Sequence, residues 1–169
     1  MKLVSSNDPI LKTVCEDFDF YNPPFDPIEF SKEFVKFMYD SNGIGLAANQ
    51  IGLPYRIFAM RSHPENFVCF NPRIVSSSSN EIVLEEGCLS YPGLLVKIKR
   101  PENIRVRFQT PNGETLTKQF IGMTARTFQH EIMHIDGKTF KDFCSRLTLE
   151  RACKKANKLG YDYSISSFY

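Results

Sequence analysis

Alternation of apolar and charged residues marks two segments in the middle of the chain, Leu95–Lys99 and Ile104–Phe108. A two-residue period is typical of antiparallel strands with one buried face and one solvated face. A turn at Thr110–Gly113 leads into a third strand, expected from Thr115 to Ile121. The lysines and arginines of these strands therefore indicate a solvated sheet face rather than a basic binding surface.

The sequence Asp26-Pro27-Ile28-Glu29 is typical of a helix start, with an N-cap, a proline at the first helical position and a capping-box glutamate. Apolar residues then recur at helical spacing until Asn42-Gly43, where we expect the helix to end. These apolar residues are Phe30, Phe34, Val35 and Met38.

Two strands are expected after this helix, at residues 56–60 and 66–70. Asn71-Pro72 should end the second strand. Residues 76–80, four serines and an asparagine, predict a polar loop, and strand-like sequence resumes at Ile82.

A later helical segment, from Met123 to Gly137, has two distinct sides at about 100° per residue. One side is apolar and should pack against a sheet; it carries Phe128, Ile132 and Ile135. The opposite side carries Met123, Thr127, His130, Glu131 and His134. Gly137 should stop the helix, because glycine adopts the left-handed cap conformation without strain.

An amphipathic helix is expected between Phe140 and Lys158, with lysines and arginines on its outer side. Its apolar side comprises Leu149, Ala152, Cys153, Ala156 and Leu159. The tail, Tyr161–Tyr169, matches no pattern of known role. The elements together predict a single α+β domain over residues 1–169, with antiparallel sheets packed around the central histidine-bearing helix and with N-terminal and C-terminal helices.

Composition agrees with one compact domain: 169 residues, 42% apolar and 24% charged. The net charge is +2 and no Lys/Arg block exceeds a short pair, so we expect no direct nucleic-acid binding. No apolar run approaches the roughly 18 residues of a membrane span, and the N-terminus resembles neither a signal peptide nor a transit peptide. Five scattered cysteines suit a reducing compartment, so a cytoplasmic location is expected.

His130-Glu131-Ile132-Met133-His134 is the strongest chemical signal in the chain. Histidines four residues apart on a helix lie on one face, where both can bind one divalent metal ion, with the glutamate beside them to act on water. The spacing alone leaves two interpretations open: a hydrolytic metal site, or two ordinary histidines on a helix.

Two further motifs accompany this one: Gly43–Gln50, with the sequence GIGLAANQ, and Glu86–Ser90, with the sequence EGCLS. Turn residues, Tyr91-Pro92-Gly93, follow the second. Together with Gln129–His134, and in this order, the motifs resemble those of the peptide deformylase family, from about residue 3 to about residue 160. That family removes the formyl group from the N-terminal methionine of new proteins, and the chain resembles its compact bacterial and organellar form.

The resemblance implies that Cys88, His130 and His134 bind one divalent metal ion, with a fourth position open for water. Spacing alone does not select Cys88 from the five cysteines. The other four, Cys15, Cys69, Cys144 and Cys153, are expected to be small buried residues. The resemblance implies ferrous iron in the cell, with zinc, nickel or cobalt able to occupy the site in preparations.

The resemblance also implies a mechanism. Metal-bound water is the nucleophile, and Glu131 is the general base that later returns the proton to the amine. The side-chain amide of Gln50 and the backbone N–H of Leu89 would stabilise the negative charge that grows on the formyl oxygen.

Other residues are expected to support the site. By resemblance, Glu86 and Arg100 form an ion pair that holds the Cys88 loop, and Gln129 is a structural hydrogen-bonding residue. Ile44 and Gly45 should line the substrate channel, where a peptide can add as an extra strand. Two residues on the helix before the metal ligands, Met123 and Thr127, should help to form the pocket for the methionine side chain.

The chain departs from the family pattern inside the histidine motif, where Met133 and Ile135 replace the usual aspartate and leucine. Met133 lies off the metal side of the helical wheel, so the ligands should keep their places. The loss of this carboxylate would be expected to change metal retention or the reaction rate relative to other members of the family.

Formyl-methionine nascent peptides are the expected partners, with a transient ribosome contact through the basic C-terminal helix. The chain is expected to be a monomer without a membrane partner.

Two rival interpretations of the function remain. A zincin-type protease shares the histidine motif but takes its third ligand from a downstream His or Glu, whereas the remaining histidine, His63, lies upstream. A non-catalytic binding module with the same fold is the other rival.

Overall fold

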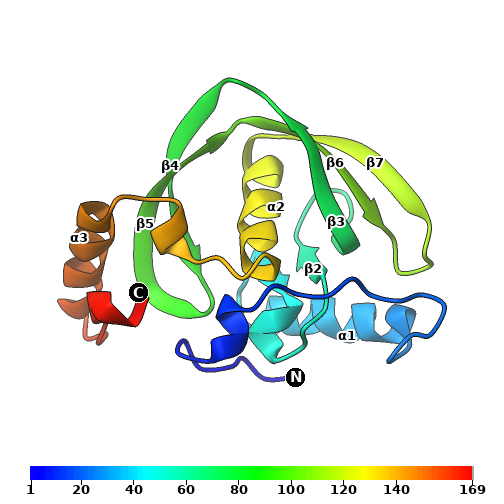
Figure 1. The fold of residues 1–169 in the computed structure, drawn as a ribbon, viewed down its shortest axis with the longest axis horizontal. Helices are drawn as coiled ribbons and strands as arrows, with labels where there is room; N and C mark the ends of the chain where they lie inside the picture. The colour runs from blue at the N-terminus through cyan, green and yellow to red at the C-terminus, as the bar shows by residue number, and fades with distance from the viewer. Residues whose placement is uncertain (169) are drawn as a thin grey trace.

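The computed structural model describes residues 1–168 and has the predicted α+β class (Figure 1). The α-helices are α1 (Pro27–Asp40), α2 (Gly122–Ile135) and α3 (Arg146–Asn157). Short 3-10 helices are η1 (Pro9–Lys12), η2 (Ala48–Ile51), η3 (Phe140–Asp142) and η4 (Ile165–Phe168). The strands are β1 (Gly45–Ala47), β2 (Ile57–Met60), β3 (Phe67–Ser77), β4 (Glu81–Cys88), β5 (Tyr91–Pro101), β6 (Asn103–Gln109) and β7 (Thr115–Ile121).

The strands form two antiparallel sheets on either side of α2. The larger sheet has the order β1-β2-β3-β6-β7, and β4 and β5 pair as a separate hairpin. In Figure 1, α2 stands between the β4–β5 hairpin and the strands of the larger sheet, while α3 lies outside the hairpin. This is the predicted arrangement of sheets around a central helix.

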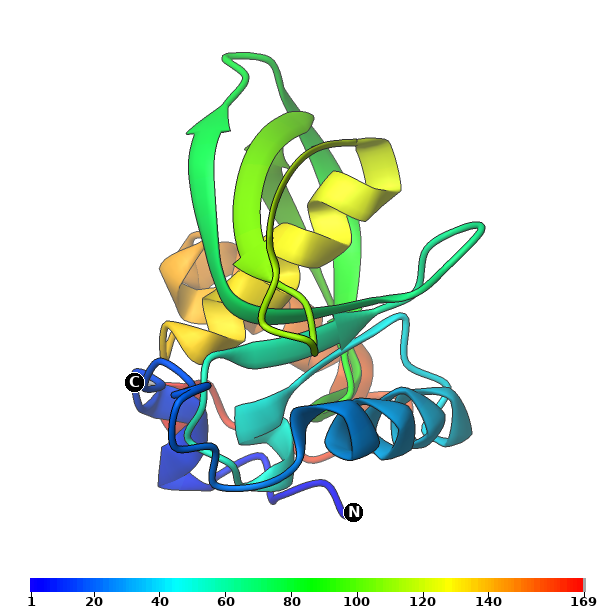
Figure 2. The ribbon, with the colours of Figure 1, turned by 90° about the vertical axis from the view of Figure 1, so that its right-hand side faces the viewer.

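Strand β2 is buried along its whole length because helices cover both of its faces. Phe58 and Met60 pack in the apolar cluster that contains Phe128 of α2. Ile57 and Ala59, which point to the opposite face, pack in the cluster that contains helix α1. Figure 2 shows β2 between α1 and α2.

The start of α1 is as predicted. Asp26 is the N-cap, its carboxylate accepts hydrogen bonds from the amides of Ile28 and Glu29, and Pro27 is the first helical residue. The helix ends at Asp40, close to the predicted stop.

Helix α2 has a second apolar side that the helical wheel does not predict. Phe128 and Ile135 face the larger sheet as expected. Met133, on another side, is 1% exposed and packs with residues of β5 and α3. Because sheets and helices surround α2, a single apolar stripe was the wrong expectation. The helix ends at Ile135, and Gly137 has a positive φ of 66°, as predicted for the stop.

The alternation in β5 and β6 is confirmed: Val96, Ile98 and Val106 are fully buried, and the lysines between them are exposed. The prediction for β3 was too short. The strand continues through Asn71-Pro72 to Ser77, with a register shift between Phe70 and Arg73. Asn71 takes a positive φ of 50°. The proline is thus accommodated at an irregularity in the pairing of β3 with β6.

The hairpin turn after Cys88 is also tighter than predicted. Leu89 and Ser90 form the turn, and Tyr91, Pro92 and Gly93 already belong to β5. Cys88 and Tyr91 are therefore paired across the turn.

Helix α3 buries Leu149, Ala152, Cys153 and Ala156 as predicted. Leu159 does not belong to that apolar side: the helix ends at Asn157, and Leu159 is 70% exposed. Within the tail, Tyr169 lies outside the described residues. No helix in residues 1–168 has the length and apolar character that crossing a membrane requires.

Candidate active site

The three predicted ligands converge at the junction of α2 and the β4–β5 hairpin. One ligand atom each from Cys88, His130 and His134 lies within 4.8 Å of the other two. Cys88 Sγ lies 3.1 Å from His134 Nε2. This separation is close to that expected for a sulfur and a nitrogen that bind one ion, with bonds of about 2.3 Å and about 2.0 Å.

Glu86 orients His130 and binds two arginines at once. Its Oε2 lies 2.9 Å from His130 Nδ1, and because an ionised carboxylate only accepts, Nδ1 carries the proton and Nε2 keeps its lone pair for a ligand. Arg100 donates to both carboxylate oxygens, at 2.7 and 2.9 Å. Arg126 Nη1 donates to Oε1 at 2.8 Å. Burial alone would raise the pKa of Glu86, but the hydrogen bonds from Arg100 and His130 and their charges hold it well below its usual value.

Glu131 is 2% exposed, and its Oε2 has no hydrogen-bond partner among the described residues. Burial, with the charge of Glu86 nearby, raises its pKa well above the ordinary value. Its carboxylate lies against Gly45, where a Cβ would come within 2.1 Å of Oε1. A buried carboxyl oxygen without a partner indicates that a ligand of the site completes its contacts.

The donor set suits a divalent cation. Burial raises the pKa of the Cys88 thiol to about 12 and lowers that of His134 well below its usual value, assisted by the charges of His130 and Arg100. A thiol, a carboxyl group and two imidazoles thus meet in one largely buried place. A metal ion would stabilise thiolate and carboxylate together, and soft sulfur with imidazole nitrogen suits iron, zinc, nickel or cobalt.

Gln50 lies beside the thiol. Its Oε1 accepts from the amide of Ala47 at 2.8 Å, and its Nε2 lies 2.9 Å from Ser90 Oγ and 3.5 Å from Cys88 Sγ. The side-chain amide therefore faces the end of β4 at Cys88 and the turn that follows it. Ser90 was not predicted, although its position in the EGCLS motif is a usable signal.

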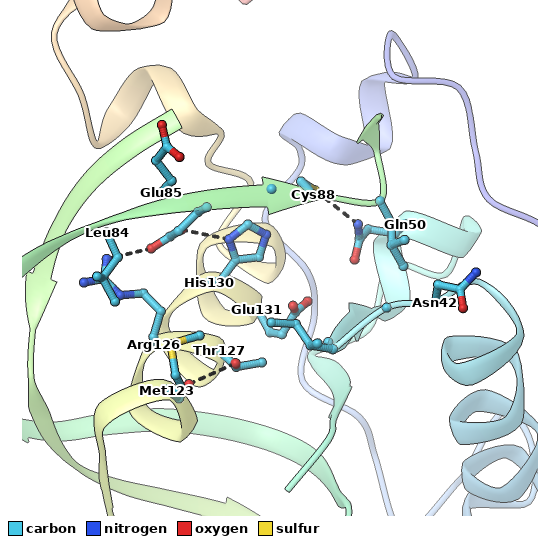
Figure 3. Close-up of a pocket in the computed structure, with 16 residues that line it drawn as sticks. Asn42, Gln50, Leu84, Glu85, Cys88, Met123, Arg126, Thr127, His130 and Glu131 are labelled. Atoms are coloured by element: carbon cyan, nitrogen blue, oxygen red, sulfur yellow. Dashed lines mark hydrogen bonds and ion pairs between the residues drawn. The ribbon is translucent and has the colours of Figure 1, made fainter. Parts of the chain in front are cut away.

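The site opens into a pocket of about 340 Å³. Its walls include five residues predicted for the site or the substrate channel, Ile44, Gly45, Leu89, Met123 and Thr127. Figure 3 shows Cys88 on the hairpin, His130 and Glu131 on α2, and Gln50 on the opposite wall, all directed toward a common space. Ile44 and Met123 are more than half exposed, so they form the outer part of the pocket.

The match to known proteins covers most of the chain. The family model described as polypeptide deformylase matches residues 1–150. The chain belongs to the peptide deformylase family.

Curated deformylases show the same relationship. A peptide deformylase of Mesorhizobium japonicum is 34% identical over 165 residues, which cover 95% of this chain and 93% of that protein. One from Afipia carboxidovorans is 39% identical over 135 residues, covering 76% and 78%.

Solved structures agree with the fold. A deformylase of Legionella pneumophila superposes with a TM-score of 0.83 at 32% identity, covering 94% of both chains. The Synechococcus elongatus enzyme in complex with actinonin gives a TM-score of 0.87 at 25% identity, covering 99% of this chain and 89% of that one. The chain is thus a deformylase, a hydrolase that removes the formyl group from nascent peptides, in a family that depends on a metal ion.

Arg126 is a residue of this deformylase's site that was not predicted from the sequence. Arg126 binds Glu86 and also donates to the carbonyl oxygens of Ile98 and Ile82, so it joins α2 to both strands of the hairpin. It lies four residues before His130, on the same side of the helix, which is a signal that sequence alone offers.

Met133 stands where the family motif was expected to have aspartate, and it is not one of the three converging residues. Its Sδ lies 3.7 Å from Arg100 Nη2, and the methionine packs in the cluster between β5 and α3. The arginine already has Glu86 as its carboxylate partner. Gln129 donates to the carbonyl oxygens of Pro101 and Ala125.

Proposed function

We propose that this deformylase is a metal-dependent amide hydrolase that removes the formyl group from the N-terminal formyl-methionine of newly made proteins and releases formate. The observation that carries the proposal is the convergence of Cys88, His130 and His134 beside Glu131, whose Oε2 has no hydrogen-bond partner within residues 1–168. Both rival interpretations lack such support: a zincin uses no thiolate ligand from a hairpin, and a binding module needs no buried base.

Cys88 Sγ and one nitrogen from each of His130 and His134 would hold a single divalent ion, and ferrous iron is the ion we propose for the cell. When bound, the ion acts as a Lewis acid that lowers the pKa of water from 15.7 toward about 7. Zinc, nickel or cobalt would serve in preparations.

Glu131 moves the proton. Its Oε2 accepts a proton from the attacking water, which its raised pKa favours, and then passes that proton to the departing amine nitrogen as the formyl C–N bond breaks. The carboxyl group needs no rearrangement to reach the pocket, because Oε2 makes no other contact with a hydrogen-bond donor of the described residues.

Gln50 and Leu89 stabilise the formyl oxygen as it gains negative charge. The side-chain amide of Gln50 faces the thiol of Cys88, and Leu89 lies in the adjoining turn. Donors aimed at such a charge in a dry site are each worth about 3 kcal/mol.

The methionine side chain of the substrate would fit the pocket walls formed by Met123 and Thr127 on α2. Ile44 and Gly45 would border the peptide backbone, which can add to the edge of a strand. Glu86, Arg100 and Gln129 hold the ligands in place through the contacts described above.

The test is incubation of the iron-loaded protein, purified without oxygen, with formyl-methionine peptides. Formate release with intact internal peptide bonds would support deformylation. Cleavage of internal bonds would instead indicate a protease, and no product with iron, zinc, nickel or cobalt would favour a binding module.

The wider setting of the reaction follows from its substrate. We propose that the chain works as a monomeric single domain in the cytoplasm, where formylated nascent chains emerge. A transient ribosome contact is favoured by the exposed cations of α3, which include Arg151 and Lys155. Cosedimentation with ribosomes should weaken when Arg151 and Lys155 are changed to glutamate, with deformylation of a short peptide unchanged.

A further inference from the structure

The chain after α3 turns back toward the hairpin that carries Cys88, and this segment lies beyond the residues matched by the family model. In Figure 1 the C-terminal end lies beside β5. Asn157 fixes the return: its side chain accepts from the amide of Tyr163 at 2.8 Å and donates to the carbonyl oxygen of Tyr163 at 3.0 Å.

Three aromatic residues of this segment contact the start of β5. The hydroxyl of Tyr163 donates to the carbonyl oxygen of Pro92 at 2.8 Å. The ring of Tyr161 lies so close to Gly93 that a Cβ there would come within 2.0 Å of it. The third, Phe168, is 2% exposed, with its ring centroid 5.2 Å from that of Tyr91.

These contacts meet the hairpin directly opposite the metal-binding thiol. Tyr91 is the cross-strand partner of Cys88, and both belong to or pack against the apolar cluster that contains Phe168. The β4–β5 ladder is irregular at this point, with a register shift between Glu86 and Cys88. Regular backbone pairing therefore does not by itself fix the position of the Cys88 thiol. Side chains that pack behind Tyr91 can help to set that position.

We propose that residues 161–168 form a C-terminal strap whose residues Tyr163 and Phe168 position Cys88 and the adjoining Leu89 N–H for the metal and the substrate. The inference rests on the proposed metal-dependent function and adds positioning residues from outside the region that the family model covers. Tyr163 holds the backbone at Pro92, and Phe168 fills the space behind Tyr91. Groups that orient a metal ligand typically contribute 10- to 100-fold in metal affinity or activity.

The experiment compares Phe168→Ala, Phe168→Leu and Tyr163→Phe with the parent protein, all loaded with cobalt(II). Leu159→Ala is the matched control, since Leu159 lies in the same segment and is 70% exposed. Four quantities are measured well below the thermal midpoint of each variant: the dissociation constant for cobalt(II), the sulfur-to-cobalt charge-transfer absorption, and kcat and KM for formate release.

We expect Phe168→Ala to weaken cobalt affinity about tenfold or more, to alter the charge-transfer band and to lower kcat more than KM changes. Phe168→Leu should restore most of the loss, Tyr163→Phe should show a smaller effect in the same direction, and Leu159→Ala should match the parent. If the tail only stabilised the fold, Phe168→Ala would lower the thermal midpoint and leave the other measured quantities unchanged.

The proposed role of the strap is overturned if Phe168→Ala and Tyr163→Phe keep the parent's cobalt affinity, charge-transfer absorption and kcat within twofold, whatever the change in thermal midpoint. Failure of the proposed function looks different. In that case the parent protein itself releases no formate with any of the metals, or binds cobalt without a thiolate band.

Discussion

At the scale of single residues, Gly45 and Glu131 are fitted to each other. A Cβ at position 45 would lie 2.1 Å from Glu131 Oε1, far inside van der Waals contact. Both residues are buried, one in β1 and one in α2, so neither can move far in a close-packed interior. Glycine at position 45 therefore sets where the carboxyl group of the base can be.

Gly45→Ala should lower kcat by about 100-fold, because a displacement of the base by about 1 Å has that effect. Glu131→Gln, which keeps the shape but not the base, should lower kcat by about 10²–10⁴-fold. If the glycine acts through the carboxyl group, adding Gly45→Ala to Glu131→Gln should cause little further loss. Formate release by the three variants completes the cycle.

Full additivity of the two substitutions would contradict this account, since it would mean that Gly45 affects the reaction independently of Glu131. The metal content of each variant serves as the control. It should equal that of the parent, because neither residue is among the three converging ligands.

The residues at the site were predictable to different degrees. The two histidines four residues apart, with a glutamate between them, can be recognised as a candidate metal site from a single short segment of sequence. Cys88 required the resemblance, because nothing in its own spacing separates it from the other cysteines. The contact between Gly45 and Glu131 joins segments far apart in the chain, so only the folded structure reveals it.

At the scale of elements, Glu86 joins β4 to β5 and α2. It pairs with Arg100 and Arg126, and all three side chains are about 5% exposed or less. Removal of the carboxylate leaves two guanidinium groups buried without their anion, which is far more costly than the pair is worth.

Glu86→Ala should therefore lower the free energy of unfolding by about 3–5 kcal/mol, measured by urea unfolding of the metal-free protein at pH 7. Glu85→Ala is the matched control: Glu85 is the preceding residue in the same strand, it is exposed, and its loss should change stability by no more than about 0.5 kcal/mol. Equal effects of the two substitutions would show that the buried network does not hold the hairpin to α2.

Asp26 gives α1 a pH-dependent start. Hydrogen bonds from the amides of Glu29 and Ile28 lower the pKa of its carboxyl group below the usual 3.8. A pKa that is lower in the folded state means that the ionised group stabilises the fold. This stabilisation is complete above pH 3.8 and is lost as the pH falls through the lower, folded value.

Asp26→Asn keeps a capping side chain but cannot ionise, so it isolates this effect. We expect the thermal midpoint of the parent to exceed that of Asp26→Asn by a few degrees at pH 6 and by less at pH 3. Asp26→Ala, which loses the cap as well, should melt lower than Asp26→Asn at both values. A difference between parent and Asp26→Asn that grows on acidification would contradict the assigned role.

Elements with regular patterns were predicted well, and those that break a pattern were not. β6 and the second half of β5 alternate between buried and exposed positions as expected, although β5 begins earlier, at Tyr91; helix α1 begins at its predicted cap. The proline in β3 suggested an end, yet a bulge accommodates it, because the strand resumes pairing with β6 at Arg73. The second buried side of α2 exists only because a hairpin and α3 pack there.

At the scale of the whole molecule, the candidate metal ligands come from two bodies of structure. His130 and His134 lie on α2, which packs against the larger sheet, whereas Cys88 lies at the end of the separate hairpin. An ion bound by all three would connect the hairpin to the helix. The two clusters on either face of β2 are apolar and contain none of the three ligands, so their packing does not depend on the ion.

Removal of the metal should accordingly abolish formate release and lower the thermal midpoint while leaving the secondary structure intact. Binding to the folded state alone adds about 2.7 kcal/mol when the free ion is at 100 times its dissociation constant. For a chain of this length that corresponds to a rise of about 5–10 °C. Circular dichroism of chelated protein, before and after addition of nickel or cobalt, measures both the content of helix and strand and the midpoint.

The cysteines provide the matched pair for this test. Cys88→Ala should remove the metal-dependent rise, whereas Cys144→Ala, a partly buried cysteine outside the ligand group, should keep it. A rise that survives in Cys88→Ala would mean that the ion binds elsewhere. Loss of all secondary structure on chelation would mean that the apolar clusters around β2 cannot fold without the ion, contrary to the independence inferred from their composition.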